Sequence, residues 1–461
     1  MSQMSTQPSR RSRLPWPRLA LLAYVTATVL FGQSAGVDED YAVYTDPPRL
    51  ILTKARLRLL QRERERKSMR WEQFDALVAG GAAMPEPGFS WALYYRVAGD
   101  ATVGKKAVDW ALSDQSKPEQ DLRQLALVFD WCGPLLTPPQ SERLAAKIRR
   151  GITAPAIPFS GKPAQVLAAV AIADTLPDHG ASVLKAVVEG WRKNVANKLE
   201  AGQPAVSREQ AYVLFEMLHA LRDNLKLDLR DDAPRYFKTL PTYHLVSHYP
   251  LTFAGPENEF RVPVYIRDGQ PDLTDAAMSR AAELAMVAYD TNEAENQFLQ
   301  GWLMQDRFLL RGPFGVPYEF LWANPYQPGL SYFHAPLLFH DALTGNLFAR
   351  TTWDEDADWV GYFDGHLQVV RDGKIQSLRL GGSTPPVRIG EAVILTAPDR
   401  DTPKFKADNE TIFVIGLAPN ATYDVEIDDQ ELSEAESDNG GTMVLTLPEG
   451  IEAGVRMKRR P

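Results

Sequence analysis

The chain has almost no cysteine. Cys132 is the only one among 461 residues, so no intramolecular disulfide can form and the fold must depend on buried apolar surface. Its apolar setting, in the segment LVFDWCG, predicts a buried packing residue rather than a nucleophile.

A basic surplus and the common nucleotide-binding motifs are also missing. The net charge of −9 and the pI near 5.5 disfavour nucleic acids and anionic membrane surfaces as partners. No P-loop, GxGxxG or GxSxG sequence occurs, so nucleotide binding and serine-hydrolase chemistry have no support, and we predict no cofactor. The length predicts two to three domains of an ordinary soluble protein.

No apolar run is long enough to span a bilayer comfortably. The longest candidate, Leu19–Phe31, follows Arg10, Arg11, Arg13 and Arg18 and precedes small residues. This order is typical of an export signal, so we predict that residues 1–36 are a signal peptide or an uncleaved N-terminal anchor. The protein would then be exported, either periplasmic or secreted, with the anchor as its only link to a membrane.

Helical periodicity dominates from about residue 48 to residue 310. Apolar residues recur at i, i+3, i+4 and i+7 in Leu184–Val195 and Leu214–Leu225, and Ser207 with Gln210 forms a potential capping box before the second series. Further helices are expected around 53–79, 91–112, 119–131, 139–151, 163–175, 281–288 and 294–310. Because 164–173 is apolar nearly all round, it must be covered on most sides, as in stacked helical hairpins around a ring.

The pattern changes to short strands after about residue 345. The sequence WVGYF-DG-HLQVV indicates a hairpin that turns at Asp364-Gly365, and Asp372-Gly373 indicates a second turn. Further strands are expected at 391–396, 411–416, 421–427, 442–447 and 454–458. The fold class is therefore α then β: an incomplete (α/α) toroid over 46–310, followed by an antiparallel β-sandwich over 345–461.

An aromatic, proline-rich segment joins these two parts. Residues 311–341 contain eight aromatic side chains and only three charged ones, and their prolines predict an irregular connection rather than a continuous helix. The rings either pack between the domains or stack on sugar rings. We therefore predict that 311–344 lines a cleft and that Trp322, Tyr326 and Tyr332 bind substrate.

Three segments resemble the heparinase II/III-like polysaccharide lyases and their alginate-lyase relatives. DPPRLILTKARLRLL (Asp46–Leu60) is similar to the entry of the first toroid helix in that family, and LALVFDWCGPLLTPPQSERLAAKI (Leu125–Ile148) to its recurring helical hairpin. LFARTTWDEDADWVGYFDGHL (Leu347–Leu367) resembles the start of its C-terminal β domain. The family's usual Asn-His pair is absent, and the matching helix opens with Gly161-Lys162-Pro163-Ala164-Gln165 instead.

The resemblance implies cleavage of a uronic-acid-containing glycan by β-elimination. Tyr or His removes the C5 proton and protonates the leaving oxygen, while a cation or strong donors neutralise the carboxylate. The segment TYHLVSHYP has the densest group of such side chains, so Tyr243, His244, His248 and Tyr249 are the candidate catalytic residues. His334 is a further candidate, and Arg261 and Gln165 are candidate carboxylate-binding residues. The predicted partner is an acidic polysaccharide or oligosaccharide.

Other interpretations of these residues stay open. A glycoside hydrolase on the same toroid would use two carboxylates, with Glu257, Glu259 and Glu319 as candidates. The missing Asn-His pair instead favours a carbohydrate-binding or scaffold protein without catalysis. His244 and His248 have metal-ligand spacing but no third ligand, and the acidic run Asp354–Asp358 lacks the glycines of a calcium loop, so we predict no metal site. His219 is expected in the core.

Overall fold

The computed structural model describes residues 40–460, except for 154–161, 256–258, 268, 306–309, 382–383, 397–404, 407–409, 428–432 and 446–451. By their contacts, residues Tyr41–Pro461 form one compact unit, in which helices come first and strands follow. The signal predicted for 1–36 lies outside the described residues. Among the residues described, no helix combines the length and the apolar character that a membrane span requires.

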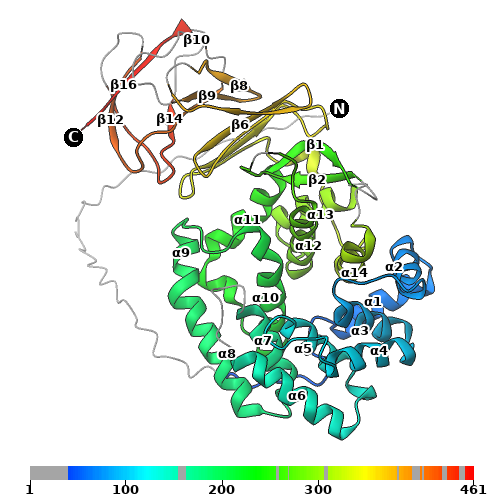
Figure 1. The fold of residues 1–461 in the computed structure, drawn as a ribbon. Coiled ribbons are helices and arrows are strands. Elements are labelled where there is room, and N and C mark those ends of the chain that lie inside the picture. The colour runs from blue at the N-terminus through cyan, green and yellow to red at the C-terminus, as the bar shows by residue number, and fades with distance from the viewer. Residues whose placement is uncertain are drawn as a thin grey trace, which may run out of the picture. The chain divides into compact units, whose positions relative to one another are not determined.

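The N-terminal two thirds of the described chain are helical (Figure 1). The α-helices are α1 (Lys54–Glu65), α2 (Met69–Ala79), α3 (Pro87–Ala98), α4 (Ala101–Leu112), α5 (Leu122–Trp131), α6 (Pro138–Thr153), α7 (Lys162–Ala171), α8 (Pro177–Trp191), α9 (Asn197–Glu200), α10 (Ala211–Leu225), α11 (Pro234–Val246), α12 (Leu273–Tyr289), α13 (Ala294–Gln305) and α14 (Gly312–Trp322). Short turns of other helix types are η1 (Gly133–Leu135), η3 (Arg192–Ala196), η4 (Arg208–Gln210), η5 (Leu229–Asp232) and η6 (Tyr332–His334).

Alternate helices form a ring. The helices α3, α5, α7, α10, α12 and α14 contact one another in succession, and α14 also contacts α2 and α3, so the series returns to its start. Helices α4, α6 and α8 pack against α3, α5 and α7 (Figure 1). This coverage explains why the predicted all-round apolar helix, now α7, is buried along most of its length. The predicted toroidal arrangement is therefore confirmed, and the ring is more complete than expected.

Most predicted helices are confirmed, but two of them are divided. The predicted helix 53–79 breaks between α1 and α2, where Lys67 has a φ of 51°, and the helix 91–112 breaks at Gly99, with a φ of 77°. A residue in this left-handed region ends a helix, and glycine adopts it without steric cost. The capping box of Ser207 and Gln210 is present before α10.

The aromatic segment does not have the irregular backbone that its prolines predict. Residues 312–322 form α14, because Pro313 occupies the first turn, where a missing N–H costs nothing, and Pro317 removes a single helical hydrogen bond. Phe320 packs against Trp71 and Phe74 of α2, and Tyr318 packs against Phe89 of α3. These rings close the ring of helices, and burying each one contributes roughly 1.5–3 kcal/mol.

A buried ion pair lies inside the ring of helices. Arg123 of α5 donates from Nε to Glu216 of α10 at 2.6 Å and from Nη1 to Glu86 at 3.0 Å. The hydroxyls of Tyr212 and Tyr318 donate to these two carboxylates. Every charged group in the network therefore has a partner of opposite charge, as buried charges require.

A two-stranded hairpin interrupts the helices between α11 and α12. Strands β1 (His248–Ala254) and β2 (Glu259–Pro263) pair antiparallel, in a region where only helices were predicted. Gln368 holds the hairpin against the β part, because its amide donates to the carbonyl of Tyr265 at 3.0 Å and accepts from Tyr249 at 2.6 Å.

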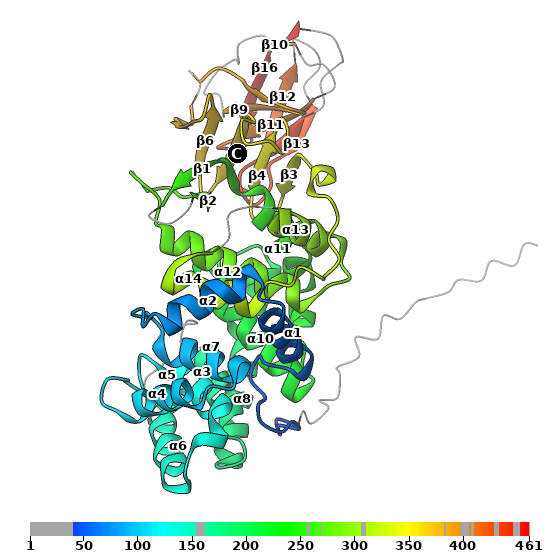
Figure 2. The same ribbon diagram turned by 90° about the vertical axis from the view of Figure 1, so that its right-hand side faces the viewer.

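The C-terminal part consists of stacked sheets (Figure 2). The five-stranded sheet contains β3 (Leu338–Asp341), β4 (Asn346–Arg350), β5 (Trp359–Phe363), β6 (His366–Arg371) and β7 (Lys374–Leu378). A four-stranded sheet has the order β14 (Met443–Leu445), β11 (Thr411–Ile415), β9 (Ala392–Thr396), β8 (Val387–Ile389). The remaining strands are β13 (Ser433–Glu436), β12 (Thr422–Ile427) and β16 (Val455–Arg459), which form a three-stranded sheet, and the pair β10 (Phe405–Lys406) and β15 (Glu452–Ala453).

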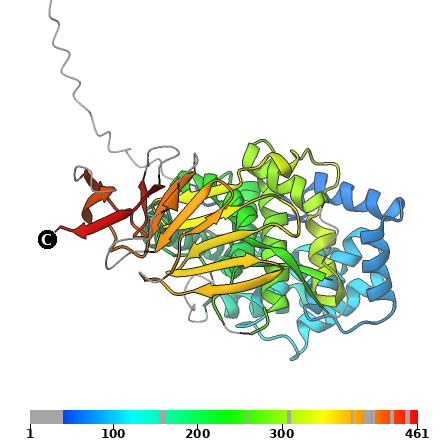
Figure 3. The same ribbon diagram turned by 90° about the horizontal axis from the view of Figure 1, so that it is seen from above.

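Alternation of side chains along the strands defines the layers. Leu347 and Ala349 of β4 pack against the four-stranded sheet, whereas Phe348 between them belongs to the core of the helical part. On the four-stranded sheet, Val393 faces the three-stranded sheet and Ile394 faces the five-stranded one. The layers therefore follow in the order helical part, five-stranded sheet, four-stranded sheet and three-stranded sheet. In Figure 3 the strands of these sheets are coloured from yellow to red in chain order.

The predicted sandwich is confirmed, with one difference in strand direction. The hairpin turns at Asp364-Gly365 and Asp372-Gly373 are present, and all four residues have positive φ, as such two-residue turns require. The exception is β9, which pairs parallel with β11. Parallel pairing is possible because β10, which lies between them in the chain, belongs to another sheet. Each predicted strand from 391 to 458 overlaps an observed one.

Candidate functional site

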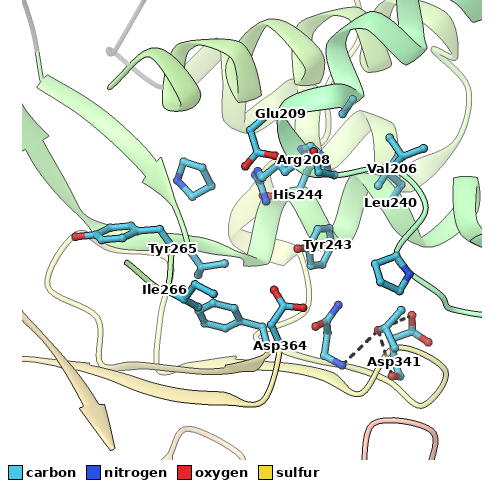
Figure 4. A pocket seen from close by; sticks show the side chains of 18 of the residues that line it. Val206, Arg208, Glu209, Leu240, Tyr243, His244, Tyr265, Ile266, Asp341 and Asp364 are labelled. Carbon is cyan, nitrogen blue, oxygen red and sulfur yellow. Dashed lines mark hydrogen bonds between the residues drawn. The ribbon is translucent and has the colours of Figure 1, made fainter. Parts of the chain in front are cut away.

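A cavity of about 540 Å³ lies where the helical part meets the five-stranded sheet. Its walls come from the α9–η4 connection, η4, α11, β2 and its following loop, the start of α12, the β3–β4 turn and the β5–β6 turn. Figure 4 shows Tyr243 of α11 between Arg208 of η4 and Asp364 of the β5–β6 turn. The site therefore combines residues that are far apart in the sequence.

Arg208 organises one wall of this cavity. Its Nε donates to Ser279 at 2.7 Å, Nη1 donates to Ser247, and Nη2 donates to the carboxylate of Glu283 at 2.9 Å. Glu283 has no exposed surface. Burial alone would raise the pKa of Glu283, but His248, His244 and Arg208 outweigh it and lower this pKa to about 2. Glu283 is thus a buried carboxylate anion at neutral pH.

Glu283 also determines the protonation of His244. The Nδ1 atom of His244 lies 3.2 Å from Glu283 Oε1, and a carboxylate can only accept, so Nδ1 carries the proton and Nε2 keeps its lone pair. Burial, with Arg208 adding to it, lowers the pKa of His244 to about 4. The ring is therefore a neutral base at physiological pH, although only 1% of it is exposed in the cavity wall.

Tyr243 is the more accessible of the two predicted residues in the cavity. Its ring is half-buried, and the guanidinium carbon of Arg208 lies 5.8 Å from the ring centroid. Burial raises the pKa of Tyr243, and Arg208 opposes this increase. A phenol beside a fixed cation can transfer a proton to or from a bound molecule, because the cation stabilises the phenolate.

Charged side chains of both signs line the cavity, and the acidic ones are more numerous. The arginines are Arg208, Arg235 and Arg267, and the carboxylates are Glu209, Asp272, Asp275, Asp341 and Asp364. Arg235 pairs with Asp341 at 3.0 Å, whereas the pair of Arg267 with Asp272 is longer, at 3.8 Å. Apolar surface comes from Tyr236, Tyr265, Ile266 and Phe339.

The local sequence explains how Tyr243 and His244 reach this wall. Helix α11 begins with Pro234 at its first position and continues through Pro241, so TYHLVSHYP spans its last turn and the start of β1. The helix ends at Val246, and Ser247 accepts a hydrogen bond from Val264 at 2.9 Å, which fixes the change from helix to strand. His244 and His248 lie on either side of this change, and both rings approach Oε1 of Glu283, at 3.2 Å and 3.5 Å.

The other two residues of this segment do not line the cavity. His248 packs against Trp302, and its Nδ1 donates to the carbonyl of His244 at 2.8 Å. Burial lowers the pKa of His248 to about 3. The hydroxyl of Tyr249 donates to Gln368, and its ring packs on Trp359. Tyr249 therefore stabilises the junction with the β part, whereas His248 belongs to the buried network around Glu283.

The remaining predicted residues also lie outside the cavity lining. Arg261 donates to the carbonyl of Pro250 and pairs with Glu355 at 3.3 Å. Gln165 is buried on α7 and donates to the carbonyl of Ile152 at 2.9 Å. His334 is exposed on η6.

The three aromatic residues predicted to bind substrate have separate environments. Trp322 is buried in the ring of helices and donates to Tyr212 at 3.1 Å. Tyr326 is 57% exposed and accepts a hydrogen bond from Arg66 at 2.6 Å. Tyr332 stacks on Phe333, with ring centroids 4.4 Å apart. Within 311–344, only Phe339, Asp341 and Thr344 line the cavity, so its C-terminal end alone contributes to this site.

The two described carboxylates among those proposed for a hydrolase, Glu259 and Glu319, do not line this cavity. Glu319 is buried on α14, where it pairs with Arg280 at 3.3 Å. Glu259 is exposed on β2 and does not line the cavity, and Glu257 lies outside the described residues. His219 is in the core as predicted, with Nε2 3.1 Å from the carbonyl of Ala285, and Cys132 is buried as predicted.

Sequence reasoning missed Arg208, Glu283 and the lining carboxylates. The capping box marked the start of a helix at Ser207, and Arg208 follows it directly, but nothing in the sequence indicates that η4 faces α11 and α12. Glu283 lies within the apolar face of α12, and a charged residue there is the one signal that could have identified it.

The described side chains do not assemble a metal site. No group of three or more His, Cys, Asp or Glu among them has an arrangement that could hold a metal ion. The acidic run after Trp353 forms part of the β4–β5 connection, and Asp358 pairs with Arg371 at 3.7 Å.

Comparisons with known proteins do not identify a family. No family model matches this chain, and no curated protein matches it. A solved structure described as a glycoside hydrolase is similar over 81% of this chain and 71% of its own, with 9% identity and a TM-score of 0.32. A likeness of this size carries no argument about activity, so the resemblance to the heparinase II/III-like lyases stays a prediction.

Proposed function

We propose that this protein processes a carbohydrate in the cavity, with Tyr243 as the group that transfers a proton. The observation that carries the proposal is the position of Tyr243 in the cavity wall, backed by the buried network of Arg208, Glu283 and His244. The volume of about 540 Å³ is within the range of small-molecule sites, roughly 300–1,000 Å³. Tyr236 and Tyr265 offer aromatic faces, and the polar groups offer the hydrogen bonds that sugar hydroxyls need.

The reaction that this arrangement supports best is β-elimination. The phenolate of Tyr243 removes the proton at C5 of a uronic acid unit, the bond from C4 to the glycosidic oxygen breaks, and Tyr243 passes the proton that it has taken to the departing oxygen, which restores the phenolate. The product carries a C4–C5 double bond, and no water is consumed. His244, held neutral by burial, packs against Tyr243 with ring centroids 5.9 Å apart and helps to fix the position of the phenol.

Binding of a uronate needs a cation for its carboxylate. Arg208 is saturated by its own partners and Arg235 is paired at 3.0 Å, so Arg267, with its longer ion pair and its exposed position, is the best candidate. The amides of Asn346 and Gln203 line the same cavity and provide neutral donors. An acidic glycan would therefore bind at the end of the cavity where Arg267 lies.

A glycoside hydrolase is the second candidate, and one observation favours it. Partial burial, together with Asp272 and Glu209, raises the pKa of Asp275. A carboxyl group whose pKa is raised suits the general acid that protonates a leaving oxygen, and a second lining carboxylate would activate water or attack the sugar. This reaction would consume water and leave no double bond.

Product chemistry separates these reactions. The full chain is incubated with uronic-acid polysaccharides and with neutral polysaccharides, and both ultraviolet absorbance of unsaturated uronate and new reducing ends are measured. Elimination gives both signals on the acidic substrates, whereas hydrolysis gives reducing ends alone. Binding without either signal would identify a non-catalytic carbohydrate-binding protein, and no binding to any polysaccharide would overturn the proposal.

The variant Tyr243→Phe tests the proposed proton transfer. It removes only the hydroxyl, so we expect activity to fall by about 100-fold or more. Tyr95→Phe is a matched control, because Tyr95 lies on α3 outside the cavity lining. If Tyr243→Phe retained full activity, Tyr243 would not be the acid or base.

We also propose that the protein is exported, from the arginines at 10–18 and the apolar run Leu19–Phe31. Fusion of residues 1–40 to a reporter that is active only after export tests this. A reporter that stays inactive would contradict it.

A further inference from the structure

Arg350 is a buried cation without a partner of opposite charge. It is the last residue of β4, on the sheet face that Phe348 turns toward the helices, and only 5% of it is exposed. Across the part of the chain that the structure describes, its guanidinium makes no hydrogen bond and no ion pair, and its Nε is buried with no acceptor. Among the described residues, Arg49 and Arg280 are buried to a similar degree, but they pair with Asp174 and Glu319.

The groups around Arg350 do not supply the missing charge. Its guanidinium lies over the indole of Trp353, 4.2 Å from the ring centroid, and this cation–π contact compensates only part of the lost hydration. Burial and the nearby Arg261 lower the pKa of Arg350 to about 9, so it stays positively charged at neutral pH. Asp354 is close enough to act electrostatically but makes no ion pair with it.

Aromatic rings extend from this cation to the surface. Tyr332 contacts Trp353 edge to face at 5.8 Å, and Phe333 stacks on Tyr332 at 4.4 Å. Phe333 is 52% exposed, so its ring is accessible from solvent. Trp353 thus links a cation that lacks an anion to a stacked aromatic pair that is open to solvent.

We propose that Arg350, Trp353 and the Tyr332–Phe333 pair form a second binding site, for a carboxylate or sulfate group carried on a sugar ring. The anion would accept hydrogen bonds from Arg350, and the C–H face of the ring would lie on the exposed aromatic pair. Arg261, which pairs with Glu355, is near enough to act on Arg350 electrostatically. None of these residues lines the cavity described above, so the site is independent of the catalytic proposal.

Titration of the full chain with small anions tests this site directly. Sodium glucuronate, sodium sulfate and uncharged glucose are added at constant ionic strength, and tryptophan fluorescence is recorded, because Trp353 lies under Arg350. We expect a saturable change with glucuronate and sulfate and none with glucose. Tighter binding of glucuronate than of sulfate would show that the ring contributes, whereas equal binding would reduce the site to one for the anion alone and overturn the sugar part of the proposal.

The variant Arg350→Gln should weaken anion binding by at least about tenfold. Arg371→Gln is the matched control, because Arg371 is an exposed arginine of the same sheet, and its binding should equal that of the wild type. Thermal unfolding gives a second readout: anions should raise the melting temperature of the wild type but not of Arg350→Gln. Unchanged binding in Arg350→Gln, or no saturable binding in the wild type, would overturn the proposal. Neither result depends on Tyr243, so failure here leaves the cavity proposal intact.

Discussion

Replacing Glu283 by glutamine should destabilise the protein substantially at neutral pH. The change removes one buried negative charge and keeps the shape of the side chain, so Arg208 is left as a buried cation without its carboxylate. The folded protein holds the pKa of Glu283 at about 2, against an ordinary value of 4.5. Removing one partner of a buried ion pair typically costs about 3–5 kcal/mol of unfolding free energy, and we expect the lower end of this range. This is a large part of the roughly 5–15 kcal/mol that stabilises a typical domain.

The sign of the pH dependence follows from the direction of this shift. Because the pKa of Glu283 is lower in the folded state, its stabilising effect is complete above about pH 4.5 and is lost as the pH falls toward 2. Urea unfolding followed by circular dichroism should therefore show a difference of about 3 kcal/mol between wild type and Glu283→Gln at pH 7, and a smaller difference at pH 3.

Glu319→Gln is a suitable control for this measurement. Glu319 is also buried and pairs with Arg280, but it does not contact His244 or the cavity. Both variants should lose stability, whereas only Glu283→Gln should alter the histidine ring signals of His244. A loss below about 1 kcal/mol for Glu283→Gln at pH 7 would refute the assignment of Glu283 as the essential counter-charge of Arg208.

Two further predictions concern the junction between the helical and β parts. The pKa values of His244 and His248 are about 4 and about 3 in the folded protein, against 6.5 ordinarily. The unfolded chain therefore binds more protons, and the free energy of unfolding should decrease as the pH falls below about 6.5. A free energy of unfolding that is constant between pH 7 and pH 5 would contradict this. Tyr249→Phe removes the hydroxyl that donates to Gln368 and accepts from Tyr265. The free energy of unfolding should therefore fall by about 1–3 kcal/mol, while activity in the cavity is unchanged. Equal stability of the variant and the wild type in urea unfolding would show that these hydrogen bonds contribute nothing.

The sequence predicts the elements of this fold well because their signals are local. The i, i+3, i+4 spacing located most helices, and the Asp-Gly turns located the hairpins of the five-stranded sheet. Errors occurred where tertiary contacts outweigh local preference. Helix α14 forms despite Pro317, because its aromatic face is buried against α2 and α3. The β1–β2 hairpin was missed because its strands are stabilised by contacts with the β part, more than a hundred residues away.

The candidate site was predictable only in part. Composition identified TYHLVSHYP as the densest group of tyrosines and histidines, and the structure places Tyr243 and His244 at a cavity. Composition could not distinguish Tyr243 and His244 from His248 and Tyr249. The latter two are buried outside the cavity, after the change from helix to strand at Ser247. The aromatic segment of residues 311–341 has the composition of a binding surface, but half of its rings, those on α14, pack within the ring of helices instead.

The order of helices and strands, the lack of disulfides and the residue types available for proton transfer can all be read from the amino-acid sequence. Which of these residues come close together depends on the tertiary fold. Glu283 and Arg208 are 75 residues apart, and Arg350 and Tyr332 come from different elements. The physical reason is that burial and electrostatic pairing depend on distances in space, which local sequence patterns do not encode.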